Sequence, residues 1–474
     1  MQYEDDTQDS ATPERTPETG DAPLVVPPAG VRAKRAVRRA VKSGVQSLGK
    51  RSNLVRKSSR WLVARKRWAN YAGHLRRTPV DDKTILFESF MGRSYSCSPK
   101  ALYRAMLADP RFDDFTFIWA FKRPTEYAEH PDFARATLVR YHSQLFYEGL
   151  ARARWWVTNS VLPAHVWPRE NQALIQTWHG TPLKRLGCDI EVSASANALY
   201  SAEEIHERYK REGRRLTWLL SPSRFATEKF ASAFDLISTG RSSAIVEEGY
   251  PRNDYLSNFD SDDVARIKAE LGIAEHKKVI LYAPTWRDNQ HTTGVGYTLE
   301  LGMDFDALRR ELGEDYVVLF RAHYFVANAF DFERHAGFVF DVSGVDDINE
   351  LYVVSDMLVT DYSSVFFDYG NLKRPIIFYM YDLGDYTVDI RGFYLDLADL
   401  PGPVVTTESE LVDAIKASES PNEASIRRYD AFSRKYTYLD DGRASERVIE
   451  RCIGSVVYHE SVASPDRSRE GAGS

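Results

Sequence analysis

The sequence predicts an α/β protein with two halves, each built on a parallel β-sheet that helices cover. Short apolar segments alternate with amphipathic ones along most of the chain, a pattern typical of parallel sheets. The alternation forms two series that meet near residue 255. Polar residues gather directly after the apolar segments, at the sheet edge where α/β proteins bind ligands. With 474 residues, 43% of them hydrophobic, the chain can form a core in each half.

The first series begins with the apolar segment KTILFESF and closes with AIVEEGYPRND, at residues 244–254. Its apolar segments are nearly continuous, as expected for strands that are buried on both faces. Between them lie segments whose apolar residues recur at helical spacing. We predict strands at 83–90, 115–121, 136–141, 154–160, 171–178 and 216–223, and helices at 98–107, 143–153, 201–213 and 224–234.

The second series repeats this alternation. We predict strands at 277–286, 315–323, 337–343, 356–363 and 374–380, and helices at 262–272, 304–312, 347–355 and 364–372. The acidic triplet DFD, from Asp304 to Asp306, opens one of these helices. Its carboxylates can cap the helix and interact favourably with the helix dipole. A metal-binding triplet is the alternative.

Charge is distributed unevenly along the chain. The first 30 residues are acidic and rich in Pro, Thr and Ser, a composition that favours disorder. Between Val31 and Arg77 there are 16 lysine or arginine residues and no aspartate or glutamate. We therefore divide the chain into an acidic tail (1–30), a basic segment (31–77), two α/β domains (78–255 and 256–455) and a disordered C-terminal tail (456–474).

The basic segment has the pattern of an amphipathic helix. Its apolar residues recur at helical spacing, as at Val37, Val41, Val45 and Leu48. A cationic helix of this kind can lie on an anionic membrane surface. A solvated linker and a nucleic-acid-binding arm are the alternatives.

What the sequence lacks excludes several classes of protein. No segment approaches 18 consecutive apolar residues, so we expect no transmembrane helix, and the N-terminus lacks the apolar core of a signal peptide. Cys97, Cys188 and Cys452 are widely separated and odd in number, which suits a reducing cytoplasm. The phosphate-loop, dinucleotide-binding, zinc-protease and α/β-hydrolase motifs are absent.

A histidine turn follows one predicted strand of the first half. The stretch QTWHGTPLKRLG places His179 between that strand and a proline that can start a helix. A neutral imidazole at this position could accept a proton from a hydroxyl group. An ordinary surface turn is the alternative.

Polar residues also follow the strands of the second half. Arg321 and His323 share one face of a strand end and could bind a diphosphate. Ser363 and Ser364 open a helix, and a helix N-terminus can bind an anion. Further candidates for this site are Thr285, Arg287, Thr360, Asp361 and Arg447. Taken singly, each has a structural alternative: an exposed strand end, a serine cap or a surface salt bridge.

Together these residues suit transfer chemistry. They supply histidines, cations and hydroxyl groups at one edge of the predicted sheets, and no metal-binding cluster. Phosphoryl-type transfer depends on positioning and on charge stabilisation. The sequence therefore predicts a transferase that uses a phosphorylated donor and an alcohol as acceptor.

Seven motifs occur in the order FESFMGRSYSCSPKALY, QTWHGTPLKRLG, YAPTWRD, FRAH, TDYSSVFFDY, RPIIFYMYD and DGRASER. Together they resemble the CDP-glycerol glycerophosphotransferase family, the polymerases and primases of teichoic acid synthesis. The resemblance extends from about residue 84 to residue 452. It implies a GT-B fold, with two Rossmann-like domains around a cleft. The first domain would bind the acceptor and the second a CDP-polyol.

The resemblance also implies roles for single residues. His179 matches the proposed base, and His323 matches the histidine that contacts the donor diphosphate. Thr360, Ser363 and Ser364 match the phosphate-binding turn, and Arg447 matches the arginine of the late helix. The candidates that face the acceptor are Arg93, Tyr95, Ser96 and Lys184.

The implied substrates are CDP-glycerol or CDP-ribitol and a lipid-linked polyol-phosphate or glycan acceptor, with no cofactor or metal required. The enzyme would transfer glycerol phosphate or ribitol phosphate and release CMP. It would work as a peripheral protein at the cytoplasmic face of the cell membrane, with its basic segment on the anionic surface and no nucleic acid as partner. The alternatives are a GT-B glycosyltransferase that uses a nucleotide sugar and a nonenzymatic membrane-surface scaffold.

Overall fold

The computed structural model describes residues 53–191, 201–285, 291–292, 296–297, 303–321, 330–383 and 392–454. Both sheets lie in one compact unit that begins at Arg67. The two predicted tails and residues 31–52 of the basic segment lie outside the described residues.

The first sheet has seven strands among the described residues, all parallel, in the order β3-β2-β1-β4-β5-β6-β7. Their bounds are β1 Asp81–Glu88, β2 Thr116–Phe121, β3 Ala136–Arg140, β4 Ala153–Thr158, β5 Ala173–Gln176, β6 Trp218–Ser221 and β7 Ile245–Glu247. The strand order reverses between β1 and β4, as in a Rossmann-like sheet. The carboxyl ends of these two strands are therefore the expected place for a ligand site.

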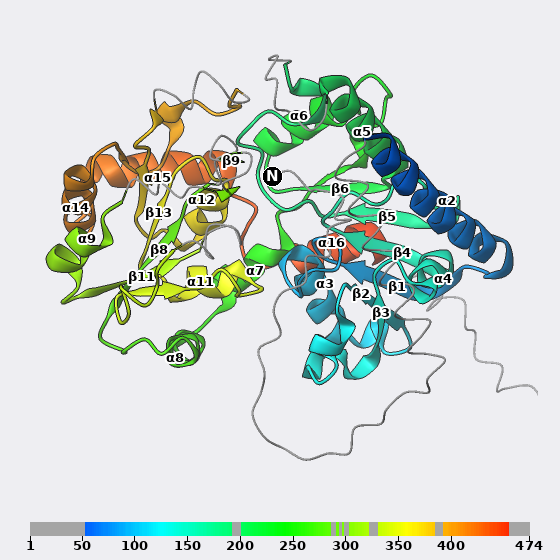
Figure 1. Cartoon of the computed structure of the whole chain (residues 1–474), viewed down its shortest axis with the longest axis horizontal. Helices are drawn as coiled ribbons and strands as arrows, with labels where there is room; N and C mark the ends of the chain where they lie inside the picture. Colours follow the sequence, from blue (N-terminus) through cyan, green and yellow to red (C-terminus); the bar gives the residue numbers. More distant parts are fainter. Residues whose placement is uncertain are drawn as a thin grey trace, which may run out of the picture. The chain divides into compact units, whose positions relative to one another are not determined.

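The second sheet has six parallel strands among the described residues, in the order β12-β11-β8-β13-β14-β15. Their bounds are β8 Lys278–Ala283, β11 Tyr316–Phe320, β12 Val339–Asp341, β13 Met357–Thr360, β14 Ile376–Tyr379 and β15 Val404–Val405. Here the order reverses between β8 and β13. A separate antiparallel pair joins β9 (His291–Thr292) to β10 (Gly296–Tyr297). The prediction of two α/β halves with parallel sheets is confirmed (Figure 1).

Helices cover both faces of each sheet. In the first half they are α3 Cys97–Leu107, α4 Gln144–Arg152, α5 Ala202–Arg215 and α6 Arg224–Ala233. In the second half they are α7 Asp254–Asn258, α8 Ser261–Glu270, α9 Phe305–Leu312, α11 Ile348–Val354, α12 Val365–Tyr369, α14 Glu408–Ala417 and α15 Glu423–Tyr436. Asp304 accepts hydrogen bonds from the N–H groups of Asp306 and Ala307, so the acidic triplet caps α9.

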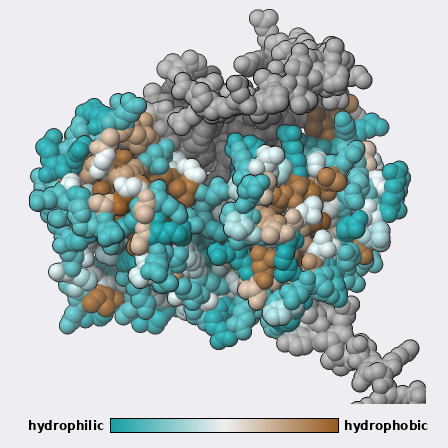
Figure 2. Space-filling model, turned by 90° about the horizontal axis from the view of Figure 1, so that it is seen from below, coloured by the Kyte–Doolittle hydropathy of each residue, from teal (hydrophilic) through white to brown (hydrophobic). Residues whose placement is uncertain are grey.

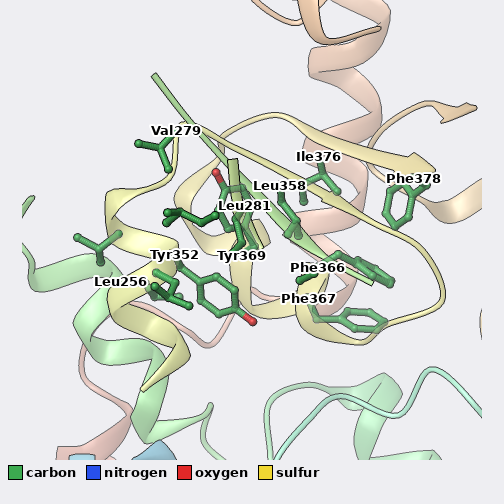
Figure 3. Close-up of a cluster of buried hydrophobic side chains, with 14 of the residues drawn as sticks. Leu256, Val279, Leu281, Tyr352, Leu358, Phe366, Phe367, Tyr369, Ile376 and Phe378 are labelled. Atoms are coloured by element: carbon green, nitrogen blue, oxygen red, sulfur yellow. The ribbon is translucent and has the colours of Figure 1, made fainter. Parts of the chain in front are cut away.

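Alternate residues along each central strand enter different cores, as the pleat of a strand requires. In β1, Ile85 and Phe87 belong to one buried cluster and Leu86 to another. In β8, Leu281 packs in the cluster that Figure 3 shows, with Leu358 of β13 and Phe366 of α12. This packing fixes the central strands, and it thereby fixes the turns at their carboxyl ends.

The last helix, α16 (Ala444–Ile449), follows the second half in sequence but packs in the first. Val448 and Ile449 belong to the same buried cluster as Ile85 and Phe87 of β1. Cys452, in the following helical turn, is also a member of that cluster. Residues 444–454 thus lie inside the predicted second domain by sequence, yet they complete the core of the first sheet (Figure 1).

Helix α2 (Asn53–Arg77) contains much of the predicted basic segment. It exposes Leu62 and Trp68, whose exposed fractions are 59% and 54%. Within the described part of the chain, we find no helix with both the length and the apolar character needed to span a membrane. Figure 2 shows one face of the molecule, on which hydrophilic residues predominate and hydrophobic ones form small patches.

Candidate active site

His179 lies in the turn after β5, at the carboxyl edge of the first sheet. The preceding residue, Trp178, has a left-handed backbone (φ 54°) and a buried side chain. The Trp178 and His179 rings stack, with 4.6 Å between their centroids. The ring of Phe90 lies 5.9 Å from that of His179. Two aromatic neighbours therefore set the direction of the imidazole.

A hydrogen bond fixes the tautomer of His179. Its Nδ1 lies 2.8 Å from the carbonyl oxygen of Asn159, just after β4. Because a carbonyl only accepts, Nδ1 carries the proton, and Nε2 of the neutral ring does not. Burial lowers the pKa of His179 to about 4. At pH 7 the ring is neutral, and Nε2 can accept a proton.

Thr285 and Asp361 meet across the two central strands of the second sheet, β8 and β13. Thr285 donates its backbone N–H (2.8 Å) and its hydroxyl (2.5 Å) to the same carboxylate oxygen of Asp361. Thr360 is fully buried and donates its hydroxyl to the carbonyl of Ala283 at 2.8 Å. The Thr360 hydroxyl therefore joins the two strands.

The predicted serine turn lies beside the His179 turn. Helix α12 begins at Val365, and Ser364 precedes it without a side-chain capping bond. Its hydroxyl oxygen lies 3.0 Å from the position that a Cβ would take at Gly180. Ser363 is half-buried. Two candidate sites from different halves of the sequence are thus brought into contact at Gly180.

Arg321 holds a loop of the second half. Its guanidinium donates to the carbonyl oxygens of Val342 (3.1 Å) and Val345 (2.7 Å) after β12. Burial lowers the pKa of Arg321. Two further candidates of this half, Arg287 and His323, lie outside the described residues.

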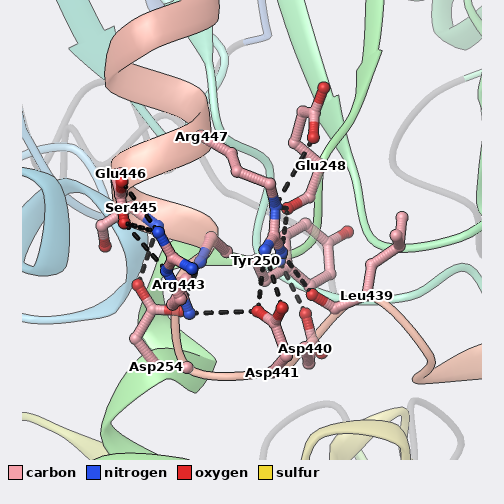
Figure 4. A network of polar contacts seen from close by, with 12 residues as sticks. Glu248, Tyr250, Asp254, Leu439, Asp440, Asp441, Arg443, Ser445, Glu446 and Arg447 are labelled. Carbon is pink, nitrogen blue, oxygen red and sulfur yellow. Dashed lines mark hydrogen bonds and ion pairs between the residues drawn. The ribbon is translucent and has the colours of Figure 1, made fainter.

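Arg447 links α16 to the first sheet (Figure 4). Its Nη2 donates to the carbonyl oxygens of Glu248 (3.0 Å) and Leu439 (2.5 Å). Its Nη1 donates to both carboxylate oxygens of Asp441, at 2.8 and 2.9 Å. These bonds tie the start of α16 to the end of β7, so Arg447 holds α16 in place against the first sheet.

The acceptor candidates near α3 differ in exposure. Tyr95 and Ser96 are buried. The hydroxyl of Tyr95 donates to Asp132 at 2.6 Å, and burial raises the pKa of Tyr95. Arg93 is exposed. It lines a surface pocket of about 270 Å³ with Lys122, Arg123, Glu126 and Tyr127. Of the three candidates, Arg93 is the one that lines this pocket.

Lys184 lies in the loop after the His179 turn. It forms an isolated antiparallel bridge with Phe393. Next to it, the N–H of Arg185 donates to the carbonyl of Gly392 at 3.0 Å. The loop behind His179 is therefore held by a segment of the second half.

Sequence reasoning missed Glu88, the last residue of β1. It is fully buried, and Thr158 at the end of β4 donates its hydroxyl to it. Burial raises the pKa of Glu88 to about 7. A carboxylate directly after the apolar run ILF was a visible signal. Asn159, which holds His179, carried no such signal. Among the described residues, no group of three or more His, Cys, Asp or Glu side chains could hold a metal ion.

Comparison with known proteins shows what this arrangement is similar to. A teichoic acid poly(glycerol phosphate) polymerase of Bacillus subtilis is 40% identical over 375 residues, which are 79% of this chain and 49% of the relative. A teichoic acid glycerol-phosphate transferase of Staphylococcus aureus is 40% identical over 371 residues, which are 77% of this chain and 92% of the relative. The chain thus spans about half the length of the first relative and most of the second.

A solved structure of a variant of the wall teichoic acid polymerase TagF, soaked with CDPG, matches with a TM-score of 0.76 and 38% identity. The match covers 86% of this chain and 99% of that one. Residues 70–454 match the family described as CDP-Glycerol:Poly(glycerophosphate) glycerophosphotransferase. The protein therefore belongs to the CDP-glycerol:poly(glycerophosphate) glycerophosphotransferase family.

Proposed function

We propose that the protein transfers glycerol phosphate from CDP-glycerol to a hydroxyl group of a teichoic acid acceptor and releases CMP. The relatives described above, which are named for glycerol phosphate, support this donor over CDP-ribitol. The observation that carries the proposal is the neutral His179, held by Asn159 through Nδ1, with Ser364 of the other half beside the neighbouring Gly180.

In the proposed reaction, Nε2 of His179 takes the proton of the acceptor hydroxyl. The acceptor oxygen forms a bond to the β-phosphorus of CDP-glycerol. The bond between that phosphorus and the oxygen that bridges to the α-phosphate breaks, and its electron pair leaves with CMP. Ser363, Ser364 and the predicted cations Arg287 and His323 stabilise the phosphoryl charge.

We assign other predicted donor residues to the frame of the site. Arg321 and Arg447 direct their guanidinium groups at backbone carbonyls. Thr285 and Asp361 bond to each other at the ends of the central strands. These residues keep the turns of a GT-B-type site in place, and the donor lies against the turns.

The pocket beside Arg93 is the proposed place for a phosphate group of the acceptor. Its three cations outnumber its one carboxylate, and a pocket of about 270 Å³ has room for a phosphate and part of a polyol. The exposed Trp68 of α2 and the cations around it support peripheral binding to an anionic, cytoplasmic membrane face that holds a lipid-linked acceptor.

The test is a transfer assay with the full chain. The protein is incubated with CDP-glycerol, and separately with CDP-ribitol, together with a lipid-linked glycerol-phosphate acceptor analogue. We expect acceptor-dependent CMP release and a product heavier by glycerol-phosphate units. Turnover with a nucleotide sugar and silence with both CDP-polyols would instead indicate a glycosyltransferase.

Two histidine variants separate chemistry from stability. His179→Ala should abolish CMP release while the Kd of CDP-glycerol stays within about threefold, because the base acts on the acceptor. His276→Ala is the matched control, since His276 is exposed and far along the chain from the turn. A His179→Ala protein with near-normal turnover would exclude the proposed base.

A further inference from the structure

A buried carboxylate lies where the first sheet reverses its strand order. Glu88 ends β1 and Thr158 ends β4, the two strands on either side of the reversal. The Thr158 hydroxyl donates to Oε1 of Glu88, and the backbone N–H of Gly92 donates to Oε2 at 3.2 Å. Ligand sites of such sheets form at this point. In this chain, the position is filled by a side chain of the protein itself.

The turn that follows Glu88 is strained. Phe90, Met91 and Gly92 all have left-handed backbones, with φ values of 48°, 57° and 75°. Such a conformation is unfavourable for Phe and Met and persists only where the surroundings impose it. A Cβ at Gly92 would lie 3.0 Å from the carbonyl oxygen of Ala120, so glycine is required there.

Side chains at the ends of β1 and β4 hold this turn through its backbone. The N–H of Phe90 donates to Oδ1 of Asn159 at 2.7 Å, and that of Met91 to the hydroxyl of Ser160 at 3.1 Å. The N–H of Gly92 donates to Glu88. Phe90 and Met91 each have one side-chain acceptor, and the Gly92 N–H is shared between Glu88 and the carbonyl oxygen of Ser89, which lies 2.9 Å away.

The turn connects the two parts of the site. At one end, the ring of Phe90 lies 5.9 Å from that of His179, and Asn159 bonds to both Phe90 and His179. At the other end, Arg93 lines the basic pocket. A shift of the turn would therefore move the imidazole and the pocket together.

We propose that Glu88 is a positioning residue, whose carboxylate holds the turn at residues 89–93 and so aligns His179 with an acceptor bound along Arg93. This proposal rests on the proposed function, in which His179 is the base. The ionised form accepts from both Thr158 and Gly92. A protonated carboxyl must donate one hydrogen bond itself, and it then accepts less well from these two donors. The turn is therefore held most firmly when Glu88 is ionised.

Glu88 should gain its proton within a pH range that can be used in an assay. Burial raises the pKa of Glu88 to about 7, although the Thr158 hydroxyl, the turn N–H groups and the Arg93 charge oppose the shift. His179 has a pKa of about 4 and is neutral throughout this range. Burial also raises the pKa of Asp440 to about 7, so it is a fall of kcat below pH 7 that disappears in Glu88→Gln that reports Glu88 rather than Asp440 or the base.

The kinetic test compares Glu88→Gln with the full-length wild type from pH 4.5 to pH 8.5. We expect wild-type kcat to fall below pH 7. At pH 8, Glu88→Gln should have a kcat about tenfold lower, because misplacement of a base slows transfer. Its KM for CDP-glycerol should change less than twofold, and its kcat should not fall until the pH approaches 4. Glu148→Gln, on the partly exposed face of α4, is the matched control. A Glu88→Gln profile identical to that of the wild type would overturn the proposal.

A second readout does not depend on activity. Met91 lies in the turn, and its ¹³C-methyl NMR signal can be assigned with Met91→Leu. We expect this signal to titrate near pH 7 in the wild type and to be independent of pH in Glu88→Gln. Thr158→Val removes a donor to the carboxylate and should move the midpoint to higher pH.

The outcomes separate the two hypotheses. If the wild type shows no turnover with any donor but its Met91 signal still titrates, the proposed function is contradicted. The role of Glu88 in the turn is then still supported. A Met91 signal that does not titrate overturns the role of Glu88. If Glu88→Gln does not fold, Thr158→Val decides, since an unchanged midpoint contradicts the proposal.

Discussion

Thr285 donates two hydrogen bonds to a single oxygen of Asp361, one from its backbone N–H and one from its hydroxyl. The two residues follow β8 and β13, between which the second sheet reverses its strand order. Thr158 and Glu88 form the corresponding pair in the first sheet. In both halves, a threonine and a carboxylate close the ends of the central strands, beside the turns that carry the candidate chemistry.

Replacing Asp361 with alanine should weaken donor binding. The variant removes the carboxylate that accepts both Thr285 bonds, and a hydrogen bond to a charged group contributes about 1.5–3 kcal/mol. We expect the Kd of CDP-glycerol, measured by isothermal titration calorimetry, to rise roughly tenfold. Asp361→Asn keeps an acceptor oxygen and should stay within about threefold of the wild type. Equal affinities for Asp361→Ala and the wild type would show that this pair does not shape the donor site.

Replacing Gly180 with alanine should displace Ser364. The new Cβ would lie 3.0 Å from the Ser364 hydroxyl oxygen, closer than normal contact. We expect kcat to fall about tenfold, because the Ser364 hydroxyl must move away from the His179 turn.

The double variant Gly180→Ala with Ser364→Ala tests the contact directly. It removes the clashing oxygen, so the thermal stability lost in Gly180→Ala should return. If the Ser364 hydroxyl also binds donor phosphate, kcat should stay low in the double variant. Additive stability effects would contradict the contact.

His179 should make the protein sensitive to mild acid. Its pKa of about 4 in the folded chain lies below the ordinary value of 6.5, so the unfolded chain binds more protons between these values. The stability that the neutral ring contributes is present above pH 6.5 and is lost as the pH falls toward 4. Between pH 7 and pH 5 this loss amounts to about 2 kcal/mol.

His179→Gln lacks this titration. Between pH 7 and pH 5, the free energy of unfolding of His179→Gln, measured with urea, should fall by about 2 kcal/mol less than that of the wild type. The same loss in both proteins would mean that His179 keeps an ordinary pKa in the folded state.

A buried ion pair should be important for stability. Arg252 donates to Asp368 at 2.9 Å, and both side chains are almost fully buried. Arg252→Ala leaves the carboxylate buried without its cation, so the free energy of unfolding should fall by about 3–5 kcal/mol. Arg224→Ala breaks the exposed pair with Glu228 and should cost at most about 1 kcal/mol. Similar losses for the two variants in urea unfolding would contradict this ranking.

The sequence was informative where the signal is local. The strands were visible as apolar segments. The start of α9 was visible too, because Asp304 caps it through hydrogen bonds from residues two and three positions further along the chain. Two helices, α14 and α15, were not predicted; they lie between the last predicted strand and the late helix that carries Arg447. A local signal was present for α14, because Thr407 and Glu410 form a capping box at its start.

The parts of the site that depend on distant contacts could not be predicted. Tyr95 looks like a candidate acceptor residue in the sequence, but it is buried because Asp132 and an aromatic cluster surround it. Thr360 was predicted to bind the donor, but its hydroxyl donates to the carbonyl of Ala283 in the neighbouring strand. Sequence spacing does not reveal which polar side chains find partners inside the fold.

The return of α16 to the first half has a consequence for synthesis on the ribosome. The chain completes all seven strands of the first sheet before the second half is made, yet Val448, Ile449 and Cys452 reach that core only at the end. Until then, apolar side chains of α3, against which α16 packs in the complete protein, remain uncovered. A nascent first half is therefore exposed to premature association, and its last folding step awaits translation of the final helix.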